Sequence, residues 1–291
     1  MTPSVSVAIA AHDPTYLDET LRSIAMQRVP ALEIIVVDDG SEPPVTVPVD
    51  LPVPVRVVRN DTPHERAAAR STALREATGE WVMVVDHDDL LADGALRDLL
   101  EVATATRCDA VFGRTARVEQ DATAPFIGRR MRPRRPRPVR WWDVFCSADH
   151  FGMVLVRTDL ARRVGFDTRF VPADDYLYAI EVAAAATAVR AERVVGAWRQ
   201  HPQQTTRTAA LSIAEAVDRV RHHVLTTHAP RGLVGRRVRG YTALRSDAYA
   251  ARRAGDAVAF RRAARRAVTQ WPPLLLTKAG LVATGGALLR R

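Results

Sequence analysis

The sequence predicts an α/β protein with a mostly parallel central sheet and a helical C-terminal part. Over the first ninety residues, apolar segments rich in β-branched residues alternate with segments of helical periodicity. Such alternation places strands in a parallel sheet with helices on both faces. After about residue 206 only the helical periodicity continues. We therefore predict a sheet domain over residues 1–205, followed by a basic α-helical region over residues 206–291.

Four strands and two helices are expected in the first ninety residues. The predicted strands are Val5–Ala10, Glu33–Val37, Val55–Val58 and Trp81–Val85. Asp13 followed by Pro14 has the pattern of a helix N-cap and first helical position. Thr62–Glu65 has the pattern of a capping box that opens a helix. Gly79 is placed to end this helix.

Further strands and helices are expected up to residue 202. They are a helix at Leu90–Ala105, strands starting at Ala110, at Phe151 and at Val194, a short helix ending at Val164, and a helix opened by Pro172–Tyr178. Between them, Gly128–Arg140 is dense in proline and arginine, which forbids a helix. It is either a solvated surface loop or a basic flap that meets an anionic acceptor or a membrane surface.

Composition narrows the class of protein. The 291 residues carry a formal charge of +9, almost entirely from arginine, which favours anionic partners such as nucleotide phosphates, acidic lipids or nucleic acid. Cys108 and Cys146 are too few for a disulfide framework, so a reducing cytosol fits. No secretory signal and no apolar stretch of spanning length is visible. We expect a cytoplasmic protein, with peripheral contact to the inner face of the plasma membrane as an option.

The strand at Trp81–Val85 stops in a cluster of acids, Asp86, Asp88 and Asp89. Carboxylates this close repel one another unless a cation lies among them. Oxygen ligands at the end of a buried strand suit a hard divalent cation that carries phosphates. The alternative is a solvated acidic turn that caps the next helix.

Two neighbouring strands are expected to end at Ala10–His12 and at Asp38 and Asp39. Because the carboxyl ends of parallel strands share one edge, one crevice should collect them with the acidic cluster. No Gly-x-Gly-x-x-Gly follows the first strand, and no Gly-x-x-x-x-Gly-Lys-Ser/Thr occurs. These absences argue against a dinucleotide-binding fold and against the common phosphate loop.

Four segments together resemble a family 2 glycosyltransferase of the GT-A fold. They are Val5–Ala11, Glu33–Ser41, Ala67–Arg75 and Gly79–Leu90. Their order and spacing match the family, and the resemblance covers roughly residues 3 to 205. At Ala11 and His12 the chain departs from it, because the family usually has Thr or Ser before Tyr or Asn.

The resemblance implies inverting transfer of a sugar from a nucleotide-diphosphate donor to an acceptor hydroxyl. Nucleotide-sugar contacts are then expected from Ala10, His12, Asp39, Arg70, Asp86 and Arg199. It also implies a Mg²⁺ or Mn²⁺ ion held by Asp88 and, through a segment similar to Tyr-Arg-x-His, by His201. A lone histidine in a loop can instead simply be solvated.

The resemblance further assigns the catalytic base to Asp175, with Asp174 as its neighbour. From the residues alone, two acids at a helix N-terminus are ordinary capping residues. The acceptor would be a cell-wall or surface glycan, a lipid-linked glycan or a small metabolite.

Two other classes compete. A non-catalytic sugar-nucleotide-binding protein of the same fold would lack a working base. A nucleic-acid-binding protein would account for the basic charge, but no recognised motif of that class is present, so no nucleic-acid partner is expected. In the C-terminal region, helices are predicted at Leu211–Thr227, Tyr241–Ala254 and Asp256–Trp271, followed by the Leu-rich segment Pro272–Leu289. This region is either a packed appendage with a solvated basic side or an interfacial membrane contact.

Overall fold

The computed structural model describes residues 3–29, 32–121, 136–146, 153–208, 210–228, 240 and 256–270. The chain forms two compact units. One comprises residues 1–145 and 150–213, and the other comprises residues 146–149 and 214–291. The strands described below lie in the first unit, so this unit carries the mixed α/β fold that the sequence predicts. The boundary at residue 205 stays a prediction.

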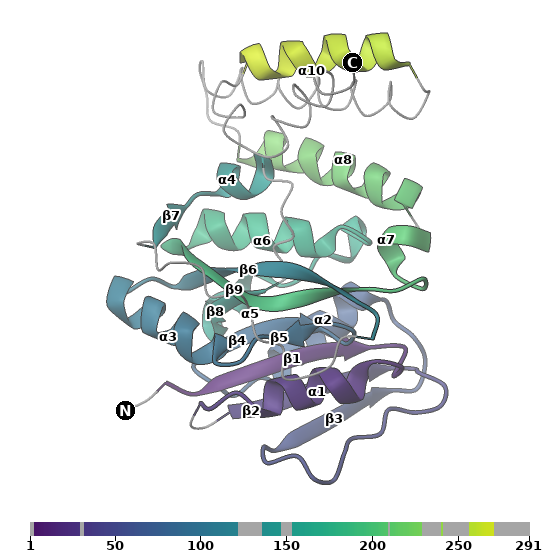
Figure 1. Cartoon of the computed structure of the whole chain (residues 1–291), viewed down its shortest axis with the longest axis vertical. Coiled ribbons are helices and arrows are strands. Elements are labelled where there is room, and N and C mark those ends of the chain that lie inside the picture. The colour runs from purple at the N-terminus through teal and green to yellow at the C-terminus, as the bar shows by residue number, and fades with distance from the viewer. Residues whose placement is uncertain are drawn as a thin grey trace. The chain divides into compact units, whose positions relative to one another are not determined.

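The first unit is built on one large sheet (Figure 1). Its strands are β1 (Val5–Ala11), β2 (Leu32–Asp39), β3 (Val55–Asn60), β4 (Trp81–Asp86), β5 (Leu90–Leu91), β6 (Ala110–Glu119), β7 (Arg137–Val139), β8 (Val154–Arg157) and β9 (Ala188–Gln200). The spatial order is β3-β2-β1-β4-β8-β6-β9-β5, and β7 pairs with β9 off this path.

The sheet is parallel in its first half and mixed in its second. β3, β2, β1 and β4 run parallel to one another. β8 is antiparallel to both β4 and β6, so β6 runs in the same direction as β4 again, and β9 is parallel to β6. The carboxyl ends of β1, β2, β4, β6 and β9 therefore lie at the same edge of the sheet.

Helices cover both faces of the sheet. The described helices of the first unit are α1 (Leu17–Ala25), α2 (Arg66–Glu76), α3 (Ala95–Thr106), α4 (Trp141–Cys146), α5 (Thr158–Val164), α6 (Asp174–Ala185) and α7 (Thr205–Thr208), with a 3₁₀ turn at Thr168–Phe170. α1 and α3 share a core with alternate residues of β1, β2 and β4. α2 packs on β1 and β2, and α5 packs on β4 and β8. Strands buried on both faces explain the uninterrupted apolar runs in the sequence.

Three predicted helix starts are wrong. α1 begins at Leu17 and not at Pro14, because Asp13 accepts hydrogen bonds from Thr15 in a turn that precedes the helix. The expected capping box at Thr62–Glu65 is absent, since α2 has no side-chain cap and Glu65 has a φ of 119°. The helix expected from Leu90 begins only at Ala95, because Leu90 and Leu91 pair with β9.

The segment before α4 differs from the expected loop in its last residues. Residues 122–135 lie outside the described part of the chain, and Arg137–Val139 form β7 against β9. In α4, Trp141, Val144 and Phe145 are buried, as the apolar sequence of this segment predicts.

Two helices are described after residue 209, α8 (Ala210–Thr227) and α10 (Ala257–Gln270). Both confirm predicted helices, and Asp256 caps α10 by accepting from the amides of Val258 and Ala259. The helix predicted at Tyr241–Ala254 and the segment Pro272–Leu289 lie outside the described residues. Within the described ranges no helix combines the length and apolarity needed to cross a bilayer. Membrane contact by the basic residues stays a prediction.

Gly79 has a different role from the one that its sequence position suggests. α2 ends at Glu76 with Ala77 as the C-cap, so Gly79 does not cap it. Instead, Gly79 lies against β1, where an added Cβ would be 2.7 Å from the Ser6 nitrogen and 2.8 Å from the Val5 carbonyl carbon. Its own amide donates to Ser6 Oγ at 2.8 Å. This close approach sets the start of β4 beside β1.

We expect Gly79→Ala to lower the free energy of unfolding by about 2 kcal/mol, because backbone atoms of β1 would have to move. Urea unfolding followed by tryptophan fluorescence measures the change. Gly165→Ala is the control, since its new Cβ has nothing closer than the Arg162 carbonyl oxygen at 3.9 Å and only its φ of 62° is strained. Any loss in that variant, about 1 to 3 kcal/mol, would come from its backbone dihedral angles (φ 62°, ψ 177°) and not from a new contact. Equal stability of Gly79→Ala and the unmutated chain would contradict this account.

Candidate active site

A cavity of about 570 Å³ lies at the carboxyl edge of the sheet. We call it the edge cavity. Its wall collects residues from the ends of β1, β2, β4 and β9, from α2 and its preceding loop, and from the segment before α6. They include Ala10, His12, Asp39, Glu65, Arg66, Asp86, Asp88, Pro172, His201 and Gln204. The structure thus brings together most of the residues that the sequence nominates.

Asp39, the last residue of β2, lines the edge cavity and is held as a carboxylate. Its side chain is 6% exposed. It accepts hydrogen bonds from Asn60 Nδ2 at 2.7 Å and from the amides of His64 at 3.0 Å and Glu65 at 3.2 Å. Burial opposes ionisation, but these donors outweigh it and hold the pKa of Asp39 below its usual value. Asp39 is therefore fixed as a hydrogen-bond acceptor.

His12 lies beside Asp39, at the position where the chain departs from the family pattern. Its Nδ1 is 3.0 Å from the carbonyl oxygen of Asp39, and the side chain is exposed. The imidazole is thereby positioned at the Asp39 end of the cavity.

Asp38, the neighbour of Asp39, has a structural role. It is buried and accepts from the amide of Ser41 at 2.9 Å and from the Arg59 guanidinium.

Asp88 and His201 line the edge cavity and lie side by side. His201 Nε2 is 2.9 Å from Asp88 Oδ2, and Gln203 Oε1 lies 3.3 Å from the other ring nitrogen. Tyr16 packs against the imidazole, with ring centroids 4.8 Å apart. His201 is thus oriented from three sides, and it is buried rather than solvated.

The Asp88–His201 pair has the chemistry of a metal-binding pair. A carboxylate oxygen and an imidazole nitrogen that meet at one point are ligands that a divalent metal accepts. In the described part of the chain, no three His, Cys, Asp or Glu side chains are grouped closely enough to hold a metal ion by themselves. The pair therefore fits a metal whose remaining ligands come from a bound diphosphate and water, as is common for Mg²⁺.

Buried polar groups of α1 hold the loop that carries Asp88. Thr20 Oγ1 lies 2.8 Å from the carbonyl oxygens of both His87 and Asp89, and Ser23 Oγ accepts from the amide of Leu91. Gln27, two residues beyond the end of α1, donates to the carbonyl oxygen of Ala92 and accepts from the amide of Leu96 in α3. Sequence reasoning missed this polar stripe of α1 and its continuation, although polar residues spaced three and four apart (Thr20, Ser23 and Gln27) are its signal.

Asp86 lies between the edge cavity and a smaller cavity next to it. The Arg70 guanidinium, which comes from α2, forms an ion pair with Asp86 and a second one with Asp174 at 2.7 Å. Burial disfavours the charge of Asp86, but Arg70 and then Arg66 overcome this effect and lower the pKa of Asp86. Arg70 is buried and does not line the edge cavity, so its charge acts through Asp86.

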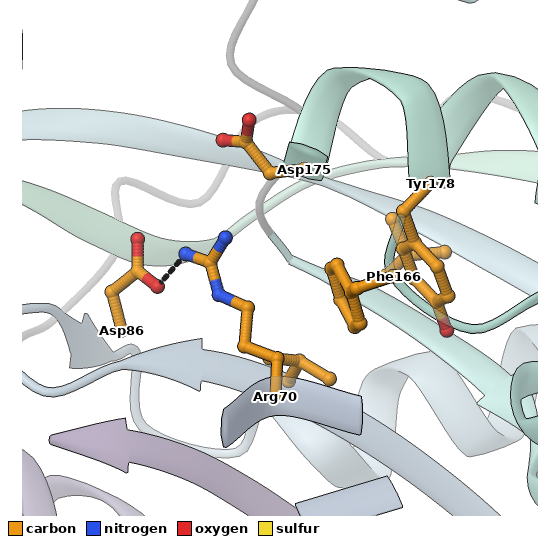
Figure 2. A pocket seen from close by; sticks show the side chains of 7 residues that line it. Arg70, Asp86, Phe166, Asp175 and Tyr178 are labelled. Carbon is orange, nitrogen blue, oxygen red and sulfur yellow. Dashed lines mark hydrogen bonds and ion pairs between the residues drawn. The ribbon is translucent and has the colours of Figure 1, made fainter. Parts of the chain in front are cut away.

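Asp175 lines the smaller cavity, which measures about 20 Å³, room for about one water molecule. Figure 2 shows the carboxylate of Asp175 at the start of α6, above the Arg70 guanidinium, with Asp86 on the other side. Phe166 and Tyr178 stack with ring centroids 4.2 Å apart and close the apolar side. Asp86 therefore lines both cavities. Asp175 lines only the smaller cavity, which it shares with Asp86.

Asp174 is placed differently from Asp175. Its side chain has no exposed surface and accepts from Arg66 at 3.2 Å and from Arg70 at 2.7 Å. It lines neither cavity. Of the two acids, only Asp175 lines a cavity.

Arg199 is also placed differently from the expectation. It is fully buried, and its guanidinium donates to the carbonyl oxygens of Asp88 at 2.8 Å and Gln120 at 2.7 Å. Its Cζ lies 4.7 Å from the centroid of the Tyr16 ring. Arg199 therefore supports the Asp88 loop from behind, and it does not line the edge cavity.

The amide of Arg199 donates to Asp89, the third acid of the cluster, at 3.2 Å. Burial and the charges of Asp88 and Asp86 raise the pKa of Asp89 well above its ordinary value.

Several cavity residues have no clear sequence signal. Arg66 lines the edge cavity and donates to the carbonyl oxygen of Pro172 at 2.8 Å. His64, His87 and Gln204 line it too. They flank the motif residues by one to four positions, so proximity to a motif is the only sequence feature that marks them.

Comparison with known proteins identifies the family. Residues 6–165, more than half of the chain, match the family model described as glycosyl transferase family 2. The chain belongs to glycosyltransferase family 2. This confirms the resemblance drawn from the four sequence segments.

Curated relatives of this family 2 chain match over part of their length. The succinoglycan biosynthesis protein ExoM of Rhizobium meliloti is 30% identical over 131 residues, 43% of this chain and 42% of that protein. An uncharacterized glycosyltransferase of Haemophilus influenzae is 33% identical over 82 residues, 28% of each chain. The match thus spans less than half the length of these relatives.

Solved structures share the GT-A fold. TarS of S. aureus in complex with UDP-GlcNAc aligns with a TM-score of 0.66 and 16% identity, covering 92% of this chain and 81% of TarS. The mannosyltransferase PcManGT of Pyrobaculum calidifontis in complex with GDP-Man and Mn²⁺ aligns with a TM-score of 0.51 and 21% identity, covering 99% and 81%. At these identities the likeness shows the fold alone.

We expect Arg70→Gln to lower the free energy of unfolding by about 3 to 5 kcal/mol, because it leaves two carboxylates without their buried countercharge. Arg66→Gln is the matched control. Its side chain is 32% exposed, so it should lose about 1 kcal/mol. Chemical unfolding of the three proteins at neutral pH measures both changes. If Arg70→Gln were no less stable than Arg66→Gln, the bridging role of Arg70 would be wrong.

Proposed function

We propose that this chain is an inverting, metal-dependent glycosyltransferase that moves a sugar from a nucleoside-diphosphate donor to an acceptor hydroxyl. The observation that carries the proposal is the edge cavity, which gathers Asp39, Asp86, Asp88 and His201 at the carboxyl ends of parallel strands. Ligands bind at this position in open α/β sheets. Family membership and the nucleotide sugars bound by TarS and PcManGT support the same donor class.

The donor is proposed to lie along the edge cavity. Its nucleoside would lie at the Asp39 and His12 end, where the ionised carboxylate can accept a hydrogen bond from an N–H group of the base. Its diphosphate would lie at Asp88 and His201. The cavity of about 570 Å³ is within the range of small-molecule sites.

Asp88 and His201 are the residues proposed to hold Mg²⁺ or Mn²⁺. When bound, such an ion would offset the negative charge that develops on the departing diphosphate. Arg199 and the polar stripe of α1 would keep Asp88 in place by bonding the backbone on either side of it. Asp86 keeps its charge because Arg70 pairs with it, so it would contribute an acceptor beside the diphosphate.

Asp175 is the proposed general base. It would accept the proton of the acceptor hydroxyl while that oxygen attacks the anomeric carbon from the face opposite the diphosphate. A single displacement of this kind needs one base and inverts the configuration. Phe166 and Tyr178 give the Asp175 cavity an apolar wall that limits water near the base. The acceptor is proposed to be a glycan, a lipid-linked sugar or a small metabolite.

Asp88→Asn should remove the metal-dependent part of donor binding. A screen of UDP-, GDP- and dTDP-sugars with and without Mn²⁺ would identify the donor by the rise in melting temperature. Ligand at 100 times its Kd stabilises a protein by about 2.7 kcal/mol. Asp18→Asn, which alters an exposed pair with Arg22, is the control and should behave like the unmutated chain. If Mn²⁺ raised the melting temperature of donor-bound Asp88→Asn as much as that of the donor-bound unmutated chain, Asp88 would be excluded from the metal site.

Asp175→Asn should bind the donor normally and lose transfer, with kcat reduced about 10²- to 10⁴-fold by the absence of a base. Product formation is measured with the donor found above and a glycan or lipid extract as acceptor. The matched control is Asp159→Asn, an exposed acid of α5 paired with Arg163. Turnover by Asp175→Asn at the unmutated rate would remove Asp175 from the mechanism. Inactivity of the unmutated chain with every donor that it binds would favour a binding protein.

A further inference from the structure

We propose that Arg70 and Asp174 act together as positioning residues that fix the base Asp175 relative to the donor-site acid Asp86. This inference rests on the proposed function. Asp174 lines neither cavity and has no exposed surface, and Arg70 is 3% exposed and lines only the smaller cavity, beside Asp86 and Asp175. Their role is to join two parts of the site that come from distant segments of the chain.

The central residue of the link is Arg70, which lies on α2. Its two terminal nitrogens are used in opposite directions, Nη2 toward Asp86 at the end of β4 and Nη1 toward Asp174 at the start of α6. Figure 2 shows the guanidinium between Asp86 and the first turn of α6. Its Cζ also lies 5.5 Å from the centroid of the Phe166 ring. The rigid, planar guanidinium of Arg70 therefore connects the donor-site acid Asp86 with Asp174, the neighbour of the proposed base.

Burial makes this link stiff. The side chain of Arg70 is 3% exposed and that of Asp174 is 0% exposed. Charges in such surroundings interact more strongly than at the surface, and removing one partner leaves the other without compensation. Arg66 adds a second hold, because it donates both to Asp174 and to the carbonyl oxygen of Pro172. The segment that leads into α6 is thus clamped at two points.

Because of the geometry of the helix, holding Asp174 in place also sets the direction in which the Asp175 side chain points. Successive residues of an α-helix point about 100° apart around its axis. Because Asp174 is held inward by two guanidinium groups, Asp175 must face a different side, and that side is the cavity shared with Asp86. Two adjacent acids therefore have separate roles, one as an anchor and one as the base.

The first test needs no substrate. Asp86→Asn weakens the charge at one end of the link. The amide of Leu177, which donates to the carbonyl oxygen of Ala173 at 3.2 Å and is the first protected amide of α6, should then exchange hydrogen at least threefold faster, although Asp86 is about ninety residues away in the sequence. Asp88→Asn is the matched control, because Asp88 makes no contact with Arg70 among the described residues. Faster exchange in Asp86→Asn alone supports the link, and equal exchange in the two variants overturns it.

The second test separates positioning from binding. Asp174→Asn keeps the shape and one acceptor, so donor Kd should stay within twofold while kcat falls about 10- to 100-fold. Glu192→Gln is the control, because Glu192 is also an acid held by two arginines, Arg114 and Arg137, on a different part of the sheet, although its side chain is 9% exposed. Arg70→Lys, which keeps the charge but cannot reach both acids, should show the same fall in kcat.

The two proposals fail in different ways. If Asp174→Asn keeps full kcat while Asp175→Asn is inactive, the positioning role is wrong and the transferase function stands. If the unmutated chain transfers no sugar, the function is wrong, and the exchange experiment still decides whether Arg70 links β4 to α6.

Discussion

The site depends on the neutralisation of acids that the fold forces together. Parallel β1, β2 and β4 end at one edge, and each is followed by polar or acidic residues. α6 brings two more carboxylates to the same region. Without countercharge these groups would repel one another. The described part of the chain supplies it from α2, whose Arg66 and Arg70 reach Asp174, with Arg70 also reaching Asp86.

Asp88 and Asp175 both lie at cavity walls. Asp88 meets His201 in the edge cavity, and Asp175 lines the neighbouring cavity together with Arg70 and Asp86. Asp174, in contrast, lines neither cavity and is held by both arginines. This division accounts for the proposed roles, a carboxylate that holds a cation beside a diphosphate and a carboxylate that accepts a proton.

Much of the fold could be predicted from the sequence, because strands buried on both faces leave continuous apolar runs. Trp81–Val85 is such a run, and the acids after it mark the sheet edge where the cavity lies. The helix starts were harder to predict, since Leu90 and Leu91 are apolar like a helix face but pair with β9 through contacts distant in the sequence.

The roles within the site were less predictable for the same physical reason. Nothing local distinguishes Asp174 from Asp175, and the difference arises only when α2 packs nearby and its arginines bind one of them. Arg199 follows the family pattern in sequence, yet its guanidinium is used by the carbonyl oxygens of Asp88 and Gln120. Burial and partners of this kind depend on tertiary packing.

The most direct measurement is a crystal structure of the chain with a nucleoside diphosphate and Mn²⁺, using the anomalous signal to locate the metal. Our account predicts a manganese peak about 2.0 to 2.3 Å from Asp88 and His201. It also predicts that the nucleobase lies beside Asp39 and that Arg70 still bridges Asp86 and Asp174. A nucleotide bound elsewhere, or a manganese ion that contacts neither Asp88 nor His201, would contradict it.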